Sequence, residues 1–243
     1  MPYRELKGNI FNSSAMAIVN TVNCVGVMGK GVALDFKLRF PDMFREYQKI
    51  CFKHLLKPGQ ILPYTKSTPI ILNFAIKDDW KDPSRVEWIE ETLQKFVANY
   101  HTLGIKSVAF PWMGAMNGGL PFETIQELTR KYLSKLEDIE IEVYDFDPDV
   151  PCALYNSLKH IISNQIFTPH ELENMSQIKV RYWEKIFNAV NDDKTKSINN
   201  LCNYVEDGKR IIGKTNIERL FIFLTNYNSG NFSITKSLFD SKQ

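Results

Sequence analysis

Apolar and polar positions follow two alternating patterns along residues 1–146. Apolar runs predict strands at 17–22, 69–76 and 107–113, the last two buried on both faces, and a final strand is predicted at 139–146. Apolar residues spaced three and four positions apart predict helices at 32–40, 43–56, 84–103 and 122–136. This order predicts an α/β fold, a three-layer α/β/α sandwich around a mixed, mainly parallel sheet.

The pattern changes at residues 145–151, DFDPDVP, whose prolines end regular structure and whose carboxylates favour solvent. Beyond this segment the sequence predicts a small, mostly helical region, with helices at 157–166, 171–190, 198–206 and 216–225. Thr168, Pro169 and Glu171 have the spacing of a capped helix start. We therefore predict two parts, residues 1–148 and residues 152–243.

Charge is divided unevenly between the two parts. The chain has 243 residues, 44% hydrophobic and 24% charged, as is typical of globular proteins, with a net charge of +2. Residues 1–150 carry a net charge of −1 and residues 151–243 a net charge of +3. This balance excludes a protein that binds nucleic acid through a strongly basic overall surface. It is compatible with a local basic contact.

The cysteines and the start of the chain bear on the compartment. Four separated cysteines without a CxxC pair (Cys24, Cys51, Cys152 and Cys202) argue against zinc and disulfide frameworks and favour a reducing cytoplasm. No apolar run approaches the roughly 18–20 residues that a membrane span requires, and the N-terminal residues lack a signal-peptide pattern. We therefore expect a cytoplasmic protein without a membrane partner.

The first candidate binding residues lie where the predicted strand 17–22 ends. Asn20 and Asn23 lead into a loop with Gly26, Gly29 and Gly31, and a helix follows. Backbone N–H groups in such a loop, together with a helix N-terminus, favour an anion. The pattern therefore predicts a phosphate-bearing nucleotide, with a simple strand-to-helix turn as the alternative. The loop is not a Walker A motif, because Gly31 stands where serine or threonine is required.

A second glycine-rich loop, Gly114–Leu120 (GAMNGGL), follows the predicted strand 107–113 and precedes another helix. Two such loops at neighbouring strand ends would suit a diphosphate held between them.

Four motifs, taken together, resemble those of macrodomains. They are Gly8-Asn9-Ile10 after a first strand, NTVNCVGVMGKGVAL, Asn73-Phe-Ala-Ile-Lys77 and the second glycine-rich loop, in this order. The resemblance covers about residues 3–146 and is greatest to the DarG type, the antitoxin of the DarT–DarG pair, and to its relatives, the terminal ADP-ribose glycohydrolases.

The resemblance implies an activity and its partners. ADP-ribose is the implied ligand and product, without a cofactor or metal, and the implied reaction releases ADP-ribose from a modified base, usually thymidine, in single-stranded DNA. The implied partners are ADP-ribosylated DNA and a DarT-like toxin. By position, Asn9 and Ile10 would lie at the adenine end, Asn23 near the distal ribose, and the two loops around the diphosphate. The implied ADP-ribose-binding residues are Gly8, Asn9, Ile10, Asn20, Asn23, Gly26, Val27, Met28, Gly29, Lys30, Gly31, Val32, Gly114, Ala115, Met116, Asn117, Gly118, Gly119 and Leu120.

Lys77 matches the lysine that this branch uses in catalysis. It ends a buried apolar strand, and a desolvated lysine has a lowered pKa, which suits a nucleophile or an electrostatic catalyst. The amine would attack the anomeric carbon of the distal ribose, or the ammonium would stabilise the departing base or position a water. The alternative is that Lys77 has no catalytic role and is a solvated lysine beside Asp78 and Asp79.

Two residues of the second loop depart from the family pattern. The terminal glycohydrolases have an aspartate there, where this chain has Asn117, which favours DNA over ADP-ribosylated glutamate as substrate. Met116 stands where DarG-type sequences commonly have glycine.

Other side chains have weaker signals. Trp80 and Trp112 would stack on a base or pack in the core, and Lys30, Lys37, Arg39 and Arg45 would contact phosphates or solvent. The four histidines are scattered and are expected at structural or surface positions.

Two other functions stay open. One is a reader that binds ADP-ribose without chemistry, and the other is a hydrolase of ADP-ribosylated protein or of small ADP-ribose derivatives. The helical region is expected to be an interaction or dimerisation module, and the oligomeric state is left open.

Overall fold

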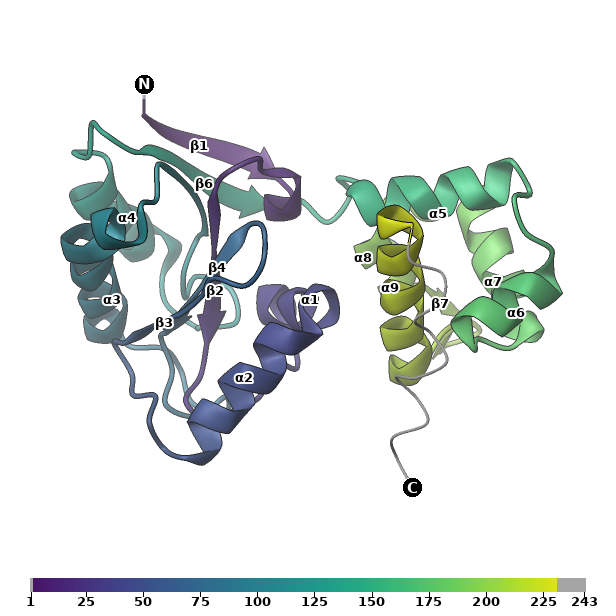
Figure 1. Ribbon diagram of the computed structural model, residues 1–243, viewed down its shortest axis with the longest axis horizontal. Coiled ribbons are helices and arrows are strands. Elements are labelled where there is room, and N and C mark those ends of the chain that lie inside the picture. The colour runs from purple at the N-terminus through teal and green to yellow at the C-terminus, as the bar shows by residue number, and fades with distance from the viewer. Residues whose placement is uncertain (1, 231–243) are drawn as a thin grey trace. The chain divides into compact units, whose positions relative to one another are not determined.

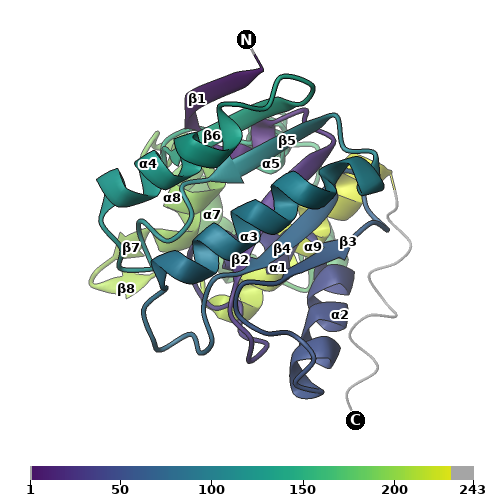
Figure 2. The same ribbon diagram turned by 90° about the vertical axis from the view of Figure 1, so that its left-hand side faces the viewer.

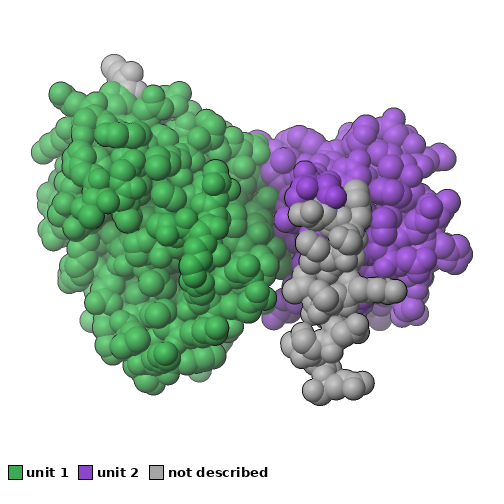
Figure 3. Space-filling model, viewed as in Figure 1, with its two compact units in different colours: residues 1–146 green, residues 147–243 purple. Residues whose placement is uncertain are grey.

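The computed structural model describes residues 2–230, and the chain divides into two compact units, residues 1–146 and 147–243 (Figure 3). Within the described residues, no helix has the length and apolar character that a bilayer crossing requires.

The first unit is built on a six-stranded sheet with the strand order β1-β6-β5-β2-β4-β3. All neighbouring strands are parallel except β3, which runs antiparallel to β4. Strand β2 pairs with both β4 and β5, so the loop that follows it opens at the middle of the sheet's carboxyl edge. The strands are β1 (Tyr3–Gly8), β2 (Ala17–Val22), β3 (Ile61–Tyr64), β4 (Ile70–Ala75), β5 (Ser107–Pro111) and β6 (Glu140–Phe146).

Helices cover both faces of this sheet (Figures 1 and 2). Helices α1 (Gly31–Arg39) and α2 (Pro41–Phe52) pack on one face, and α3 (Val86–Asn99) and α4 (Phe122–Leu133) pack on the other. Short 3-10 helices, η1 (Ile10–Asn12) and η2 (Tyr100–Leu103), complete the unit. The three-layer α/β/α fold predicted from the sequence is confirmed.

Burial on both faces explains the continuous apolar runs. Along β2, Val19 faces the core beneath α3 and α4, and Ile18 faces the core beneath α1 and α2. Both side chains are at most 2% exposed. Both faces of the strand therefore favour apolar residues, and the apolar–polar alternation of a half-exposed strand is not expected.

Strand β3 was absent from the sequence prediction. It has four residues, ILPY, and lies at the end of the sheet. Pro63 is tolerated there because an edge strand leaves one side of its backbone without a ladder partner. A short run that contains proline has no clear strand signal.

The second unit is mostly helical, as predicted. Its helices are α5 (Ala153–Ser163), α6 (Pro169–Ser176), α7 (Val180–Asn191), α8 (Ile198–Asn203) and α9 (Lys214–Ser229). The side chain of Trp183 is completely buried and lies 5.7 Å, ring centre to ring centre, from Phe223. The capping box of Thr168 and Glu171 at the start of α6 is confirmed. Residues 231–243 of the predicted helical region lie outside the described residues.

Two predictions for this unit were wrong. The helix expected at 171–190 is interrupted at Gln177, which has a left-handed φ of 59°. Next to the break, the hydroxyl of Ser176 accepts hydrogen bonds from the indole N–H of Trp183 and the amide of Ile178. The helix expected at 198–206 ends at Asn203 and continues into a hairpin, β7 (Val205–Glu206) and β8 (Lys209–Arg210). Its Asp-Gly turn is a recognisable hairpin signal.

Candidate functional site

Three segments that follow parallel strands meet at the carboxyl edge of the sheet. The amide of Cys24, after β2, donates to the carbonyl oxygen of Asp78, after β4 (2.9 Å). The amide of Ser84 donates to the carbonyl oxygen of Gly118, in the loop after β5 (2.9 Å). These bonds join segments that are distant in sequence into one site, as expected at the carboxyl edge of a parallel sheet.

The first glycine-rich loop is shaped by Asn23. Its side-chain oxygen accepts from the amides of Val25 (3.1 Å) and Val27 (3.2 Å), and its Nδ2 donates to the carbonyl oxygen of Val27 (2.5 Å). Gly26, between the two valines, has a φ of 82°, which favours glycine. Asn23 is 6% exposed and all these bonds are local. Its side chain therefore fixes the path of the loop backbone.

Below this loop, Asn20 is completely buried within the sheet. Its Nδ2 donates to the side-chain oxygen of Asn73 (2.8 Å), its register partner on β4. Asn73 in turn donates to the carbonyl oxygen of Leu62 on β3 (3.1 Å). The same Nδ2 of Asn20 lies 3.9 Å from the sulfur of Met28, which is buried under the loop. Asn20 thus supports the loop from the sheet.

The second glycine-rich loop is a tight turn. The amide of Leu120 donates to the carbonyl oxygen of Gly114 (3.1 Å), which closes the loop. A side chain at Gly118 would overlap the backbone of Gly114, so the close approach requires glycine there. Met116 (73% exposed) and Asn117 project from the loop.

Asn117 brings the two loops into contact. A β-carbon at Gly31, the first residue of α1, would lie 2.5 Å from Nδ2 of Asn117. Gly31 also has a φ of 57°. The first loop thus contacts the second at a position where both backbone conformation and space favour glycine.

Lys77 reaches the second loop from the end of β4. Its Nζ donates to the carbonyl oxygen of Asn117 (2.8 Å), and among the described residues it forms no ion pair with Asp78 or Asp79. Partial burial lowers the pKa of Lys77, and the nearby carboxylate of Asp82 offsets part of that effect. The side chain is therefore held within the site, as a solvated lysine at a strand end would not be.

The comparisons with known proteins agree with this geometry. The family model described as "Macro domain" matches residues 19–129. The solved "Macrodomain of Thermus aquaticus DarG" is 41% identical, with a TM-score of 0.56, over 59% of this chain and 97% of that one. The chain belongs to the macrodomain family, in its DarG type.

Two curated relatives are similar to part of this chain. A "DNA ADP-ribosyl glycohydrolase" of Thermus aquaticus is 42% identical over an alignment of 147 positions that covers 58% of this chain and 41% of the relative. A "DNA ADP-ribosyl transferase-DNA ADP-ribosyl glycohydrolase fusion protein" of Thermosipho africanus is 33% identical over an alignment of 172 positions that covers 59% of this chain and 44% of the relative. The chain thus spans about two fifths of the length of these relatives.

The end of β1 carries the residues predicted to lie at the adenine end. The side-chain oxygen of Asn9 accepts from the amide of Phe11 (3.0 Å) and caps the short helix η1, and Ile10 is buried at its start. Gly8 ends β1 beside Phe146 of β6. These residues, predicted to lie at the adenine end, thus lie in a fixed turn after a parallel strand.

Helix α2 contributes two residues that the sequence analysis missed. The hydroxyl of Tyr47 donates to the carbonyl oxygen of Asn23 (2.8 Å), and Nε2 of Gln48 donates to the carbonyl oxygen of Gly26 (3.2 Å). Both bonds fix the first loop of the macrodomain. A tyrosine on an apolar helix face was the available signal, because a buried hydroxyl needs a hydrogen-bond partner.

The aromatic and basic candidate residues differ in their exposure and in their partners. Trp80 is 51% exposed, whereas Trp112 is 9% exposed and packs edge-on against Phe122 at 5.4 Å. Arg45 pairs with Asp42. The charged groups of Lys37 and Arg39 lie over the rings of Phe44 (5.2 Å) and Phe11 (4.1 Å), and Lys30 is exposed at the start of α1. All four histidines are exposed.

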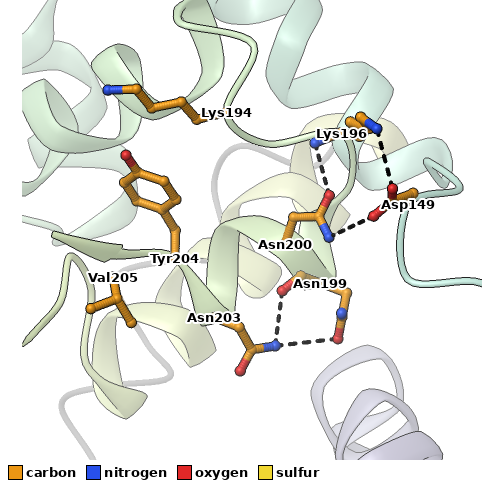
Figure 4. A pocket seen from close by; sticks show the side chains of 8 residues that line it. All are labelled: Asp149, Lys194, Lys196, Asn199, Asn200, Asn203, Tyr204 and Val205. Carbon is orange, nitrogen blue, oxygen red and sulfur yellow. Dashed lines mark hydrogen bonds and ion pairs between the residues drawn. The ribbon is translucent and has the colours of Figure 1, made fainter. Parts of the chain in front are cut away.

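The second unit has a shallow hollow of about 470 Å³ (Figure 4). Lys196 lies 3.2 Å from a carboxylate oxygen of Asp149, and Lys194 lies 2.9 Å from one of Asp192. Because each lysine faces a carboxylate, the hollow offers no surplus positive charge to an anion. It is lined by Asp149, Lys194, Lys196, Asn199, Asn200, Asn203, Tyr204 and Val205.

Proposed function

We propose that this protein removes ADP-ribose from a modified nucleobase in single-stranded DNA. The observation that carries the proposal is the position of Lys77, whose Nζ reaches from the end of β4 to the second glycine-rich loop. The names of the DarG-type relatives, which describe DNA ADP-ribosyl glycohydrolases, support the same reaction.

The proposed ligand position follows from the chemistry of the edge. Two loops rich in backbone N–H groups, one of which leads into helix α1, suit the diphosphate of ADP-ribose. The turn at Asn9 and Ile10 would receive the adenosine, and the distal ribose would lie near Lys77. Asn23, Tyr47 and Asn20 would act on the ligand indirectly, by fixing the first loop.

The reaction breaks the N-glycosidic bond between the anomeric carbon of the distal ribose and the base. In one route the neutral amine of Lys77 attacks that carbon, the base departs with the bond's electron pair and takes up a proton, and water then releases the ribose. In the other, the ammonium stabilises the departing base while water attacks. The lowered pKa of Lys77 favours the first route, because it increases the neutral fraction of the amine.

We further propose that the chain counteracts a DarT-like transferase in the cytoplasm. Support comes from the Thermosipho relative, in which a DNA ADP-ribosyl transferase and a glycohydrolase form one protein. Four separated cysteines without a CxxC pair suit a reducing compartment. Co-expression with such a transferase should restore growth with the wild-type chain and fail to do so with Lys77→Ala.

The direct test uses the full chain and an ADP-ribosylated single-stranded oligonucleotide. Lys77→Ala should lower the rate of ADP-ribose release by at least about a hundredfold, as loss of a catalytic side chain does. Affinity for free ADP-ribose, measured by calorimetry, should change little. Lys106→Ala is the matched control, because Lys106 is exposed and precedes β5, at the opposite edge of the sheet. ADP-ribose binding by the wild type without release from any modified DNA would contradict the proposal and identify a reader.

A further inference from the structure

We propose that the end of helix α2 and the turn after it bind the DNA strand that flanks the modified base. We name this region the Phe52 surface, and define it by Lys49, Phe52, Lys53, Leu55 and Lys57. The inference rests on the proposed function and specifies where the macrodomain holds its polymeric substrate.

The Phe52 surface exposes large apolar groups in a fixed conformation. Phe52 is 69% exposed and Leu55 is 61% exposed. The turn between them is closed by His54, with a φ of 55°, and by a hydrogen bond from the amide of Leu55 to the carbonyl oxygen of Ile50 (3.2 Å). This is a left-handed helix cap, so the backbone that carries the two side chains is fixed by the end of the helix.

Three lysines without acidic partners lie close to Phe52 along the chain. Lys49 lies one helical turn before Phe52 on the same side of α2, Lys53 follows Phe52 at the end of the helix, and Lys57 follows the turn. Among the described residues, none of the three forms an ion pair, whereas some other cations of the same unit do. Examples of the paired cations are Lys66 with Glu46 (2.5 Å), Lys131 with Glu90 (2.8 Å) and Arg130 with Glu5 (2.7 Å).

This surface lies at the same edge as the candidate site because β3 is antiparallel. The segment that leads into β3 reaches the sheet where the parallel strands end, and the amide of Gly59 donates to the carbonyl oxygen of Ala75 at the end of β4 (2.8 Å). A β-carbon at Gly26 would lie 3.5 Å from that of Cys51, so the last turn of α2 packs against the first loop. In Figure 1, the arrowhead of β2 and the last turn of α2 point to the same side of the unit.

A second aromatic side chain continues this surface across the first loop. The amide of Cys24 is bonded to the carbonyl oxygen of Asp78, two residues before the exposed Trp80. The ammonium of Lys81 lies 5.5 Å from the centre of the Trp80 ring. An aromatic ring with a neighbouring lysine therefore lies on each of the two segments that contact the first loop.

This chemistry favours a nucleic-acid strand over a protein partner. Single-strand binders combine aromatic rings, on which bases stack, with cations that contact the backbone phosphates. Lysine is depleted in protein–protein interfaces, whose centres exclude charge. Three lysines without ion pairs on the segment that carries an exposed ring therefore match a strand, with Phe52 stacking on a base and the lysines near phosphates.

The test uses the full chain and compares a long substrate with a short one. In the Phe52→Ala, Lys53→Ala double variant, KM for an ADP-ribosylated 12-nucleotide strand should rise about five- to a hundredfold, the range for loss of one stacked base. Release from an ADP-ribosylated mononucleoside should be unchanged, because that substrate does not reach the Phe52 surface. Binding of the unmodified strand should also depend less on salt. The slope of log affinity against log salt concentration should become shallower by about 0.7, because one lysine is removed.

The control is Met16→Ala, which removes an exposed apolar side chain just before the amino end of β2. Equal loss on the strand and on the mononucleoside, or no loss on either, would overturn the proposed surface while leaving the glycohydrolase activity established. Absence of release by the wild type would instead contradict the proposed function. If the double variant loses only its binding to a DarT-like protein and keeps strand binding, the surface contacts protein and the inference is wrong.

Discussion

The ammonium nitrogen of Lys77 lies 2.8 Å from the carbonyl oxygen of Asn117, 40 residues further along the chain. Lys77 follows β4 and Asn117 follows β5, and these strands lie on opposite sides of β2. The bond therefore passes over the end of β2, next to the first glycine-rich loop. Release of this contact would free the amine for a substrate.

The pH dependence of release should distinguish the two roles of Lys77. Asp82 raises the pKa of Lys77, so Asp82→Asn should lower it further. If the neutral amine reacts, the rate rises as pH rises through this pKa, and Asp82→Asn shifts the rise to lower pH. If the ammonium acts, the rate falls over the same range, and the variant shifts the fall to lower pH. Single-turnover rates across pH measure this, with Glu137→Gln, at an exposed site before β6, as control. An unchanged profile would exclude Lys77 as the titrating group.

Contact between the loops should make Gly31 sensitive to substitution. Gly31→Ala places a methyl group 2.5 Å from Nδ2 of Asn117 and imposes a left-handed φ of 57° on alanine. The φ strain alone should cost about 1–2 kcal/mol of unfolding free energy. Asn117→Ala in the same chain should relieve the clash and leave that strain. Urea unfolding and ADP-ribose calorimetry of the two single variants and the double variant measure the coupling, and additive effects would contradict the contact.

The buried amide pair should be more sensitive to single than to double replacement. Asn20→Leu leaves the side-chain oxygen of Asn73 without its donor, which should cost about 1–3 kcal/mol of unfolding free energy. Replacing both asparagines with leucine removes both buried polar groups and should cost less than the sum of the single changes. Denaturant unfolding of the full chain measures these values. A double variant that is at least as unstable as that sum would contradict a stabilising contact between the two amides.

The capping box of the second unit offers a prediction independent of the candidate site. Thr168→Ala removes the side-chain acceptor for the amide of Glu171, which should destabilise α6 by about 1 kcal/mol. Hydrogen exchange of the α6 amides measures this loss. Thr215→Ala, at an exposed position near the start of α9, is the control and should not accelerate exchange there. ADP-ribose release should be the same in both variants, because the candidate site lies in the first unit.

Much of the first unit could be predicted because its strands are buried on both faces. The run at 17–22 coincides with β2, since nothing polar was needed on either side except Asn20, whose amide finds Asn73. The glycine-rich loops were visible because left-handed and crowded backbone positions, such as Gly26 and Gly118, select glycine.

The rest depends on packing that no local pattern encodes. Tyr47 looked like one more apolar position of α2, and its bond to Asn23 exists only because the helix packs on that loop. In the second unit, helical periodicity continued from α6 into α7 across Gln177. The break there is stabilised by Ser176 and Trp183, whose contact forms only when the two helices fold together.

The antiparallel strand β3 separates the segment that precedes it from the two glycine-rich loops of the macrodomain. Loops that follow parallel strands carry the glycines on which the backbone path depends, so their sequences have little freedom. The segment before β3 reaches the same edge from the opposite direction and forms no part of either glycine-rich loop. If the Phe52 surface holds the DNA strand, its side chains can change without altering the glycine-rich loops, and preference for longer or shorter strands can be engineered apart from the chemistry proposed for Lys77.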